Sequence, residues 1–144
     1  MNALPVEALA VARQFIGAME RRDADAVIAL LDDEVVLEFP FPVVAGGDRP
    51  GSRRQCGKAA HAGVRGSLQT TIVIKFTNQV WRTTDDGLAL LQADGECTLS
   101  DGSPYLNHYI FLFEVREGKI VRWWEYLNPV ISARAVGIPL DSIP

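Results

Sequence analysis

The stretch YLNHYIFLFEVREGKIVRWWEYL, residues 105–127, decides the fold of this chain. Both of its halves are rich in aromatic and β-branched residues, which favour strands. Glu117-Gly118 separates the two halves with a turn signal. Residues 105–116 and 120–127 are therefore expected to pair as an antiparallel hairpin.

Two more turn signals precede this hairpin, at Asp85-Asp86-Gly87 and at Asp101-Gly102. They delimit two further expected strands, over residues 69–83 and 88–99, which complete a four-stranded antiparallel meander. Strands of roughly twelve residues are longer than the usual five or six. Such strands must curve strongly to fit a small domain, and a strongly curved sheet leaves a hollow that can hold a ligand.

The first half of the chain predicts helices. A helix that starts at Pro5 carries one apolar stripe at three- and four-residue steps, formed by Val6, Leu9, Ala12, Ile16 and Met19. Two more helices are expected over residues 24–31 and 58–65. A short strand over 35–39 lies between them, and residues 43–57 are expected to form a loop.

This order of elements predicts a single α+β domain over residues 1–144. Three N-terminal helices are expected to cover the concave face of a strongly curved, mostly antiparallel sheet, which gives a cone-shaped interior. The tail after Pro129 is expected to form a final edge or a segment that contacts a partner.

Composition narrows the class of protein. The chain has 144 residues, of which 48% are hydrophobic and 22% charged, and this excludes a disordered chain. Its net charge of −4 argues against nucleic-acid binding. No apolar run approaches the roughly 18 residues of a membrane span, and no signal peptide is evident. Cys56 and Cys97 lack CxxC spacing, so free thiols in the cytoplasm are expected.

Several motifs resemble those of one superfamily. They are RDADAV at residues 22–27, EFPF at 38–41, YLNHY at 105–109, GKI at 118–120 and EYLNP at 125–129. Together they resemble the nuclear transport factor 2-like superfamily and, within it, the SnoaL-like group, with a pattern closest to PhzA/PhzB-type phenazine-biosynthesis proteins. The resemblance implies the cone-shaped fold. It leaves the activity open, because this fold hosts isomerases, dehydratases, cyclases, epoxide hydrolases and binding modules.

Glu125 is the first catalytic candidate. It lies in the segment WWEYL, where an unpaired charge is costly, and strand alternation places it on one face with Trp123 and Leu127. A carboxyl group among indole rings should have a raised pKa, which suits general acid/base catalysis. The resemblance also implies an acid/base role for this Glu. The alternative is a rim carboxylate paired with Arg122 or Arg134, or one bonded across a dimer interface.

His61 is the second catalytic candidate, because histidine titrates near neutral pH and could share the proton transfer. It lies on the expected third helix, which in this fold lines the mouth of the cone. The resemblance matches it to a helix histidine of PhzA/PhzB-like proteins. Those proteins typically carry a serine one turn later, where this chain has Arg65. The alternative is a surface histidine.

Tyr105, Asn107 and Tyr109 share one face of their strand and are candidates for substrate binding. Two phenols and an amide could donate hydrogen bonds to a ligand carbonyl or to a developing enolate. The alternative is a core aromatic stripe in which the backbone satisfies Asn107.

Four more residues complete the predicted binding site. Trp123, Trp81 and Phe41 are expected to form its walls, and Glu38 adds a carboxylate on the first strand. Ketosteroid-isomerase-like members of the superfamily carry their proton-abstracting Asp where this chain has Phe39, so a copy of that chemistry is not expected. Neither a metal nor a cofactor is expected, because ligand spacings and nucleotide-binding motifs do not occur.

The residues and the resemblance together predict a cofactor-independent acid/base enzyme of secondary or catabolic metabolism. It would isomerise, cyclise, dehydrate or condense a small metabolite that bears a carbonyl or a carboxylate. The alternative is a non-catalytic module that binds a small hydrophobe or dimerises. A basic loop is formed by Arg49, Arg53, Arg54 and Lys58. It either attracts a carboxylate substrate by steering or is simply a solvated loop. A homodimer through the outer sheet face is expected, because Leu106, Ile110 and Leu112 alternate as a second apolar row.

Overall fold

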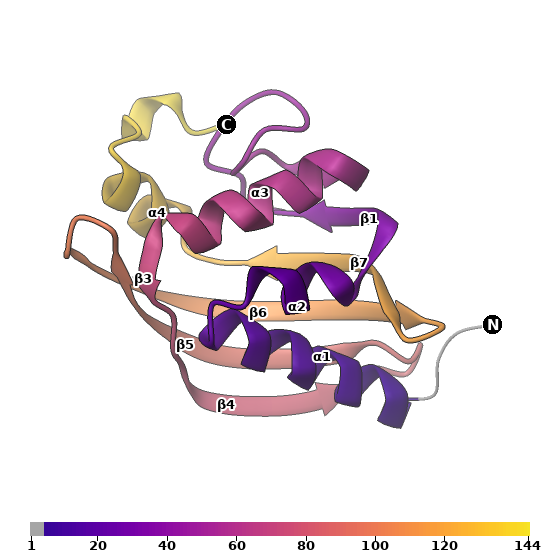
Figure 1. Cartoon of the computed structure of the whole chain (residues 1–144). Coiled ribbons are helices and arrows are strands. Elements are labelled where there is room, and N and C mark those ends of the chain that lie inside the picture. Colours follow the sequence, from indigo (N-terminus) through magenta and orange to yellow (C-terminus); the bar gives the residue numbers. More distant parts are fainter. Residues whose placement is uncertain (1–4) are drawn as a thin grey trace.

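The computed structural model describes residues 5–144 and has the α+β architecture expected from the sequence. Figure 1 shows helices α1, α2 and α3 in front of one curved sheet, with α4 at one end of it. The helices are α1 (Pro5–Glu20), α2 (Ala24–Ala29), α3 (Gly57–Gln69) and α4 (Pro129–Val136), followed by a 3-10 turn (Leu140–Ser142). The strands are β1 (Leu31–Glu38), β2 (Arg54–Cys56), β3 (Thr71–Val73), β4 (Phe76–Thr83), β5 (Ala89–Leu99), β6 (Pro104–Arg116) and β7 (Lys119–Tyr126).

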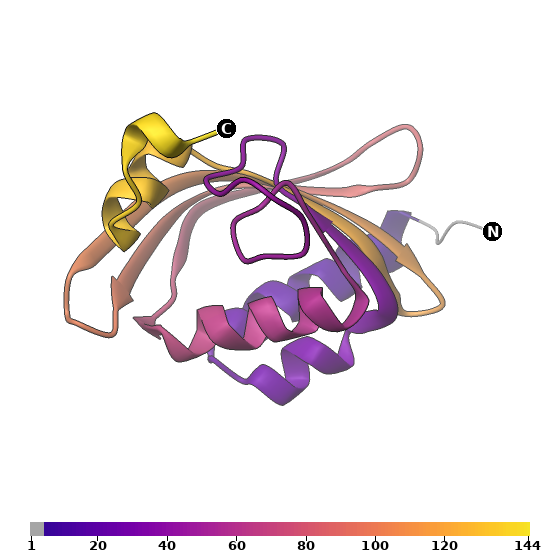
Figure 2. The same cartoon turned by 90° about the horizontal axis from the view of Figure 1, so that it is seen from above.

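The strands form one seven-stranded sheet within the described residues, in the order β2-β1-β7-β6-β5-β3, and β4 also pairs with β5. The antiparallel meander expected from the sequence is β4, β5, β6 and β7. β1 lies parallel to β7 and antiparallel to β2. Seen from above, the sheet arches over α1, α2 and α3, so its concave face is the inside of the molecule (Figure 2).

The single long strand expected over residues 69–83 is wrong, because the chain divides it in two. α3 continues to Gln69, and β3 and β4 then both pair with β5. The register shifts within each of these pairings, and Asn78 has a left-handed φ of 53°. Such irregularities increase the local bend of a sheet, which explains how so long a segment follows the curvature.

Two helix ends also differ from expectation. α2 ends at Ala29, before the expected residue 31, because β1 already begins at Leu31 and not at residue 35. α3 extends beyond the expected residue 65, because its buried face repeats at helical spacing in Ala60, Val64 and Leu68. Burial of this face outweighs the low helix propensity of the glycines within it.

The tail forms helix α4, and an edge strand was the wrong expectation. The Asn128 side chain caps the helix by accepting hydrogen bonds from the backbone N–H groups of Val130 and Ile131, at 3.0 and 3.4 Å. Pro129 occupies the first turn, where its missing N–H costs nothing. Gly137 ends the helix in a left-handed conformation with φ 75°.

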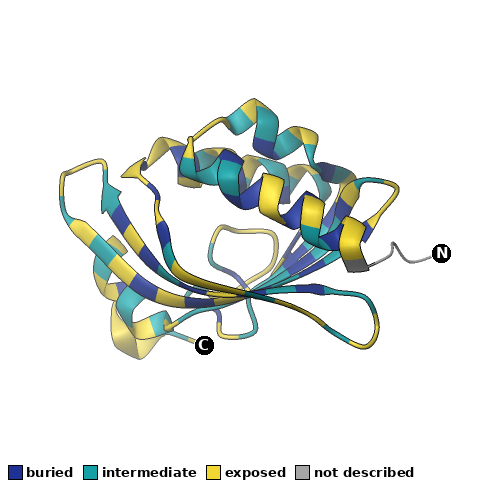
Figure 3. Ribbon diagram, turned by 90° about the horizontal axis from the view of Figure 1, so that it is seen from below, coloured by how far each residue is buried: buried dark blue, intermediate teal, exposed yellow. Residues whose placement is uncertain are grey.

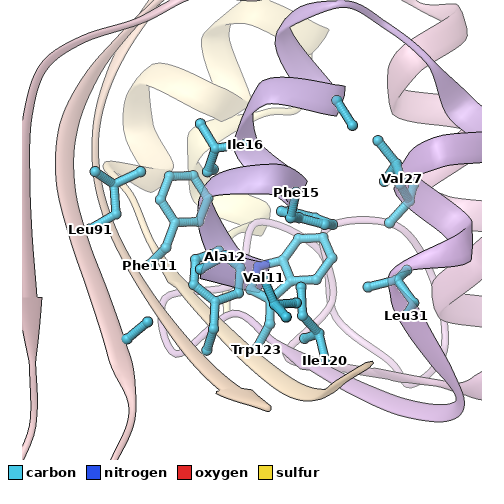
Figure 4. Close-up of a cluster of buried hydrophobic side chains, with 14 of the residues drawn as sticks. Val11, Ala12, Phe15, Ile16, Val27, Leu31, Leu91, Phe111, Ile120 and Trp123 are labelled. Carbon is cyan, nitrogen blue, oxygen red and sulfur yellow. The ribbon is translucent and has the colours of Figure 1, made fainter. Parts of the chain in front are cut away.

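The core fills one half of the cone. Phe15 of α1 lies at its centre, with ring centroids 5.5 Å from Phe113 and 4.9 Å from Trp123 (Figure 4). The buried face of α1 around it consists of Ala8, Val11, Ala12 and Ile16. The predicted stripe is therefore only partly right, because Ala12 and Ile16 are buried but Val6 is 78% exposed. Buried and exposed positions alternate along the strands (Figure 3). α1 therefore covers the half of the concave face that is formed by the start of β5, the end of β6 and the start of β7.

Candidate functional site

The other half of the concave face lines a cavity of about 570 Å³. This volume lies within the roughly 300–1,000 Å³ of small-molecule sites. The end of β5, the start of β6 and the end of β7 meet here because neighbouring strands are antiparallel. Most of the wall is apolar, including Leu37, Phe39, Ile74, Phe76, Phe111 and Leu127.

Glu125 places a carboxyl group in this apolar wall. Its side chain lines the cavity with those of Trp123 and Leu127, as strand alternation requires. None of the salt bridges within residues 5–144 involves Glu125. Arg122, one of the partners considered for it, contacts Glu38 at 3.1 Å instead. Glu125 is therefore an uncompensated acidic group that faces a cavity.

The surroundings raise the pKa of Glu125 from its ordinary value of 4.5 to about 7. Desolvation is the main cause, because the carboxylate loses more hydration than the neutral acid when it is buried. The Trp123 side chain opposes this rise in pKa. The residue keeps part of its surface accessible and lines the cavity. Near neutral pH the group can therefore either accept or donate a proton.

The indole of Trp123 lies beside this acid. The residue is 3% exposed, and its Nε1 atom is buried without a hydrogen-bond partner of normal distance and angle among the described residues. Its N–H still favours the ionised form of the Glu125 carboxyl group and so opposes the rise in pKa. Because the Nε1 atom has almost no accessible surface, it is not a contact for a ligand atom.

Tyr109 supplies a phenol to the same region. Its ring stacks on Phe111 at 5.2 Å and meets Phe76 edge-on at 5.7 Å. Gly95 on β5 makes room for the ring, because a Cβ there would lie 2.5 Å from Cε2 of Tyr109. Burial first, and then the neighbouring Tyr105 and Glu125, raise the pKa of Tyr109 well above its ordinary value. The hydroxyl therefore stays protonated and can act as a hydrogen-bond donor.

Tyr105 also lines the cavity, but Asn107 does not. The Asn107 amide donates to the Tyr105 hydroxyl, the Asn128 carbonyl and the Ser132 hydroxyl, at 2.9, 3.2 and 3.1 Å. Its carbonyl accepts from the backbone N–H groups of His108 and Asn128, at 2.8 and 3.0 Å. Asn107 is 1% exposed, and it ties β6 to the corner where α4 begins.

Replacing Asn107 with leucine is expected to lower the free energy of unfolding by about 3 kcal/mol, because it leaves several buried polar groups without a hydrogen-bond partner. Urea denaturation measures this change. Gln14→Leu is the matched control on the exposed side of α1, where a change within about 0.5 kcal/mol is expected. Equal effects of the two substitutions would contradict a structural role for Asn107.

Gln55 is a cavity residue that sequence analysis missed. It is 2% exposed, lies in β2 and lines the cavity from the side opposite the meander. Gly63 of α3 accommodates it, because a Cβ at Gly63 would lie 2.6 Å from the Gln55 Oε1 atom. The alternation of exposed Arg54, buried Gln55 and exposed Cys56 would have marked it, had residues 54–56 been read as a strand.

The structure does not bring His61 to Glu125. His61 lies outside the cavity lining, and its Nε2 atom is 3.0 Å from the Asp32 carbonyl oxygen on β1. Trp81 is also outside the lining: its indole donates to Gln79, and the Arg13 guanidinium of α1 lies 5.4 Å from the ring centroid.

Phe41 and Glu38 have different surroundings. Phe41 lines the cavity from the loop after β1, although it is 57% exposed. Glu38 is outside the lining and forms ion pairs with Arg54 and Arg122, at 2.8 and 3.1 Å. Burial alone would raise the pKa of Glu38, but the contacts with both arginines outweigh it and lower the pKa.

The described residues contain no group of three or more His, Cys, Asp or Glu side chains placed to hold a metal ion. No helix within residues 5–144 is long and apolar enough to cross a membrane. The fold is an NTF2-like cone. Its cavity lining, as far as the structure describes it, is mostly apolar and contains one acidic side chain, that of Glu125.

The sequence profile of the SnoaL-like domain matches residues 12–123, and the chain belongs to this family. The uncharacterised protein YesE of Bacillus subtilis (strain 168) is 31% identical over 129 residues, which cover 87% of this chain and 84% of YesE. The phenazine biosynthesis protein PhzB of Pseudomonas fluorescens is 33% identical over 72 residues, 47% of this chain and 44% of PhzB. A solved structure of a candidate isomerase from Bacillus subtilis has a TM-score of 0.77 at 26% identity, covering 92% of this chain and 94% of that one.

Proposed function

We propose that this protein is a cofactor-independent acid/base enzyme that acts on a small carbonyl- or carboxylate-bearing metabolite. The observation that carries the proposal is Glu125, an unpaired carboxyl group in an apolar cavity with its pKa raised to about 7. The candidate isomerase of Bacillus subtilis supports a reaction of this kind. An epoxide hydrolase from Mycobacterium tuberculosis shares the fold at 20% identity. The reaction is of the isomerisation, cyclisation, dehydration or condensation type.

The first step is the transfer of one proton. The Glu125 carboxylate accepts a proton from the carbon next to the substrate carbonyl, and the C–H electron pair moves to give an enolate. The Tyr109 hydroxyl is the donor available to the enolate oxygen. The Glu125 carboxylic acid then returns the proton, either to another carbon or to a departing hydroxyl. His61 has no role in this proposal.

Deuterium exchange tests the proposal without knowledge of the natural substrate. 2-Tetralone is a neutral bicyclic ketone with acidic α-protons, and abstraction of one of them in heavy water exchanges it for deuterium. The wild-type protein is expected to accelerate this exchange over buffer, as followed by proton NMR. A protein that leaves the exchange at the buffer rate would contradict the acid/base function.

We further propose that two copies pair through the outer face of the sheet. Val80, Gln92 and Ile110 lie side by side across β4, β5 and β6, and Val80 and Ile110 are 39% and 40% exposed. Leu106, on the same side of β6, is 58% exposed. A second copy of the chain would cover this apolar face.

Both cysteines are free and Cys56 is exposed, which fits the reducing cytoplasm.

Light scattering after size-exclusion chromatography is expected to give twice the chain mass for the wild type. Ile110→Glu places a charge at the centre of the outer face and is expected to give the mass of one chain. Lys58→Glu, a charge change on α3 on the other side of the sheet, is the control and should leave the dimer intact. A wild type with the mass of one chain would contradict the dimer.

A further inference from the structure

The cavity wall carries an acidic side chain but no basic one. Among the lining residues that the structure describes, Glu125 is the only Asp, Glu, Lys, Arg or His. The remaining polar groups of the wall are neutral, and they are Gln55, Ser67, Thr70, Thr71, Cys97, Tyr105, Tyr109 and Ser132. Burial raises the pKa values of Cys97 and Tyr109, so both stay uncharged. The cavity therefore offers hydrogen bonds but no positive charge.

The basic residues nearest in sequence to the cavity face elsewhere. The Arg54 and Arg122 guanidinium groups both contact the Glu38 carboxylate, outside the cavity lining. Arg49 donates to the carbonyl of Ala45 in its own loop. The basic loop identified in the sequence thus places no cation in the cavity wall, and a bound carboxylate would have no counter-charge there.

An anionic ligand would meet two costs in this cavity. Its charge would lose hydration against apolar side chains, and no cation would compensate the loss. It would also share the space with Glu125, so two like charges would have to coexist in surroundings of low dielectric. A neutral carbonyl, hydroxyl or ester oxygen has neither cost, because a single hydrogen-bond donor satisfies it.

Gln55 is suited to hold such a neutral oxygen. Its amide is almost fully buried, faces the cavity and makes no hydrogen bond to another described residue. Because Gly63 packs against its Oε1 atom, the side chain has little room to turn away. This amide can bind a neutral polar atom, but it cannot neutralise a carboxylate.

We propose that the cavity selects neutral, mostly apolar molecules that carry a carbonyl or related oxygen, that it excludes carboxylates, and that Gln55 binds this oxygen. This proposal narrows the class of substrates that the proposed function allows. It rests on that function only where it calls the bound molecule a substrate. Gln55 is then a determinant of binding, separate from the group that transfers the proton.

Three naphthalene probes of similar shape test the selection by charge. They are 2-acetylnaphthalene, 2-naphthoate and 2-(aminomethyl)naphthalene, measured by isothermal titration calorimetry at pH 8.5. The neutral ketone is expected to bind at least about tenfold more tightly than the carboxylate, because the carboxylate loses hydration without compensation. Carboxylate binding equal to or tighter than that of the ketone would overturn the proposal. Tighter binding of the ammonium probe than of the ketone would overturn the claim of neutrality.

Two substitutions test the role assigned to Gln55. Gln55→Met keeps the length of the side chain, removes its amide, and is expected to weaken ketone binding about three- to tenfold. The matched control is Gln14→Met on the exposed side of α1, outside the cavity lining, which should leave ketone binding unchanged. Unchanged ketone binding by Gln55→Met, in a protein that unfolds at the wild-type urea concentration, would overturn the role of Gln55.

These outcomes are separable from failure of the proposed function. If the ketone is preferred but the protein does not accelerate exchange of 2-tetralone, selection by charge stands and the acid/base function fails. If exchange is accelerated but 2-naphthoate binds as tightly as the ketone, the function stands and the selection fails.

Discussion

Glu125→Gln is expected to slow the exchange of 2-tetralone about 10²- to 10⁴-fold, the usual contribution of a general base. Glutamine has nearly the size of glutamate but cannot accept the proton. In the wild type, the rate should rise about tenfold per pH unit below pH 7 and level off above it, because the pKa of Glu125 is about 7. Cys97 and Tyr109 line the same cavity with raised pKa values and remain neutral over this range.

Glu117→Gln is the matched control for this experiment. Glu117 is exposed in the turn between β6 and β7, outside the cavity lining, and its replacement removes the same charge from the chain. It should leave the exchange rate and its pH profile unchanged. If Glu125→Gln retained the wild-type rate while binding the ketone normally, another group would have to be the base.

The same substitution is expected to stabilise the protein at alkaline pH. Burial raises the pKa of Glu125 from 4.5 to about 7, so the folded state binds the proton more tightly than the unfolded state. Below about pH 4.5 the group is protonated in both states and contributes nothing. Between about pH 4.5 and 7 the unfolded state loses its proton first, and stability falls as the pH rises. Above pH 7 the full cost of about 3 kcal/mol remains.

Glu125→Gln removes this cost, because glutamine does not ionise. The difference in unfolding free energy between the variant and the wild type should therefore grow by about 3 kcal/mol between pH 4 and pH 8. Urea denaturation at pH 4, 6 and 8 measures it, with Glu117→Gln run in parallel as the control for loss of a surface carboxylate. A difference that shrinks with rising pH would mean that the folded protein stabilises the carboxylate.

The meander could be predicted because its information is local. Gly87, Gly102 and Gly118 all adopt positive φ at the three turns, as the turn motifs require, and the strands between them alternate regularly. The same alternation placed Glu125 and Trp123 on one face. The divided edge strand could not be predicted in this way, because its break follows from pairing with β5.

The parts of the site that were missed depend on tertiary contacts. Gln55 is buried only because β2 pairs with β1, and residues 54–56 alone resemble a polar loop. His61 was placed on the correct helix, but the buried face of α3 sets the rotation of that helix and directs the imidazole to Asp32. Asn107 shares a strand face with Tyr105, yet hydrogen bonds within β6 and at the start of α4 together use its hydrogen-bonding capacity.

The pKa of Glu125 tests the central claim most directly, namely that this carboxyl group is desolvated in a cavity and poised for proton transfer. Its carboxyl carbon can be followed by NMR through a pH titration and assigned by the signal that Glu125→Gln removes. A pKa of about 7 is expected. A pKa at or below the ordinary 4.5 would show a solvated or ion-paired carboxylate, and would contradict both the site and the function proposed for it.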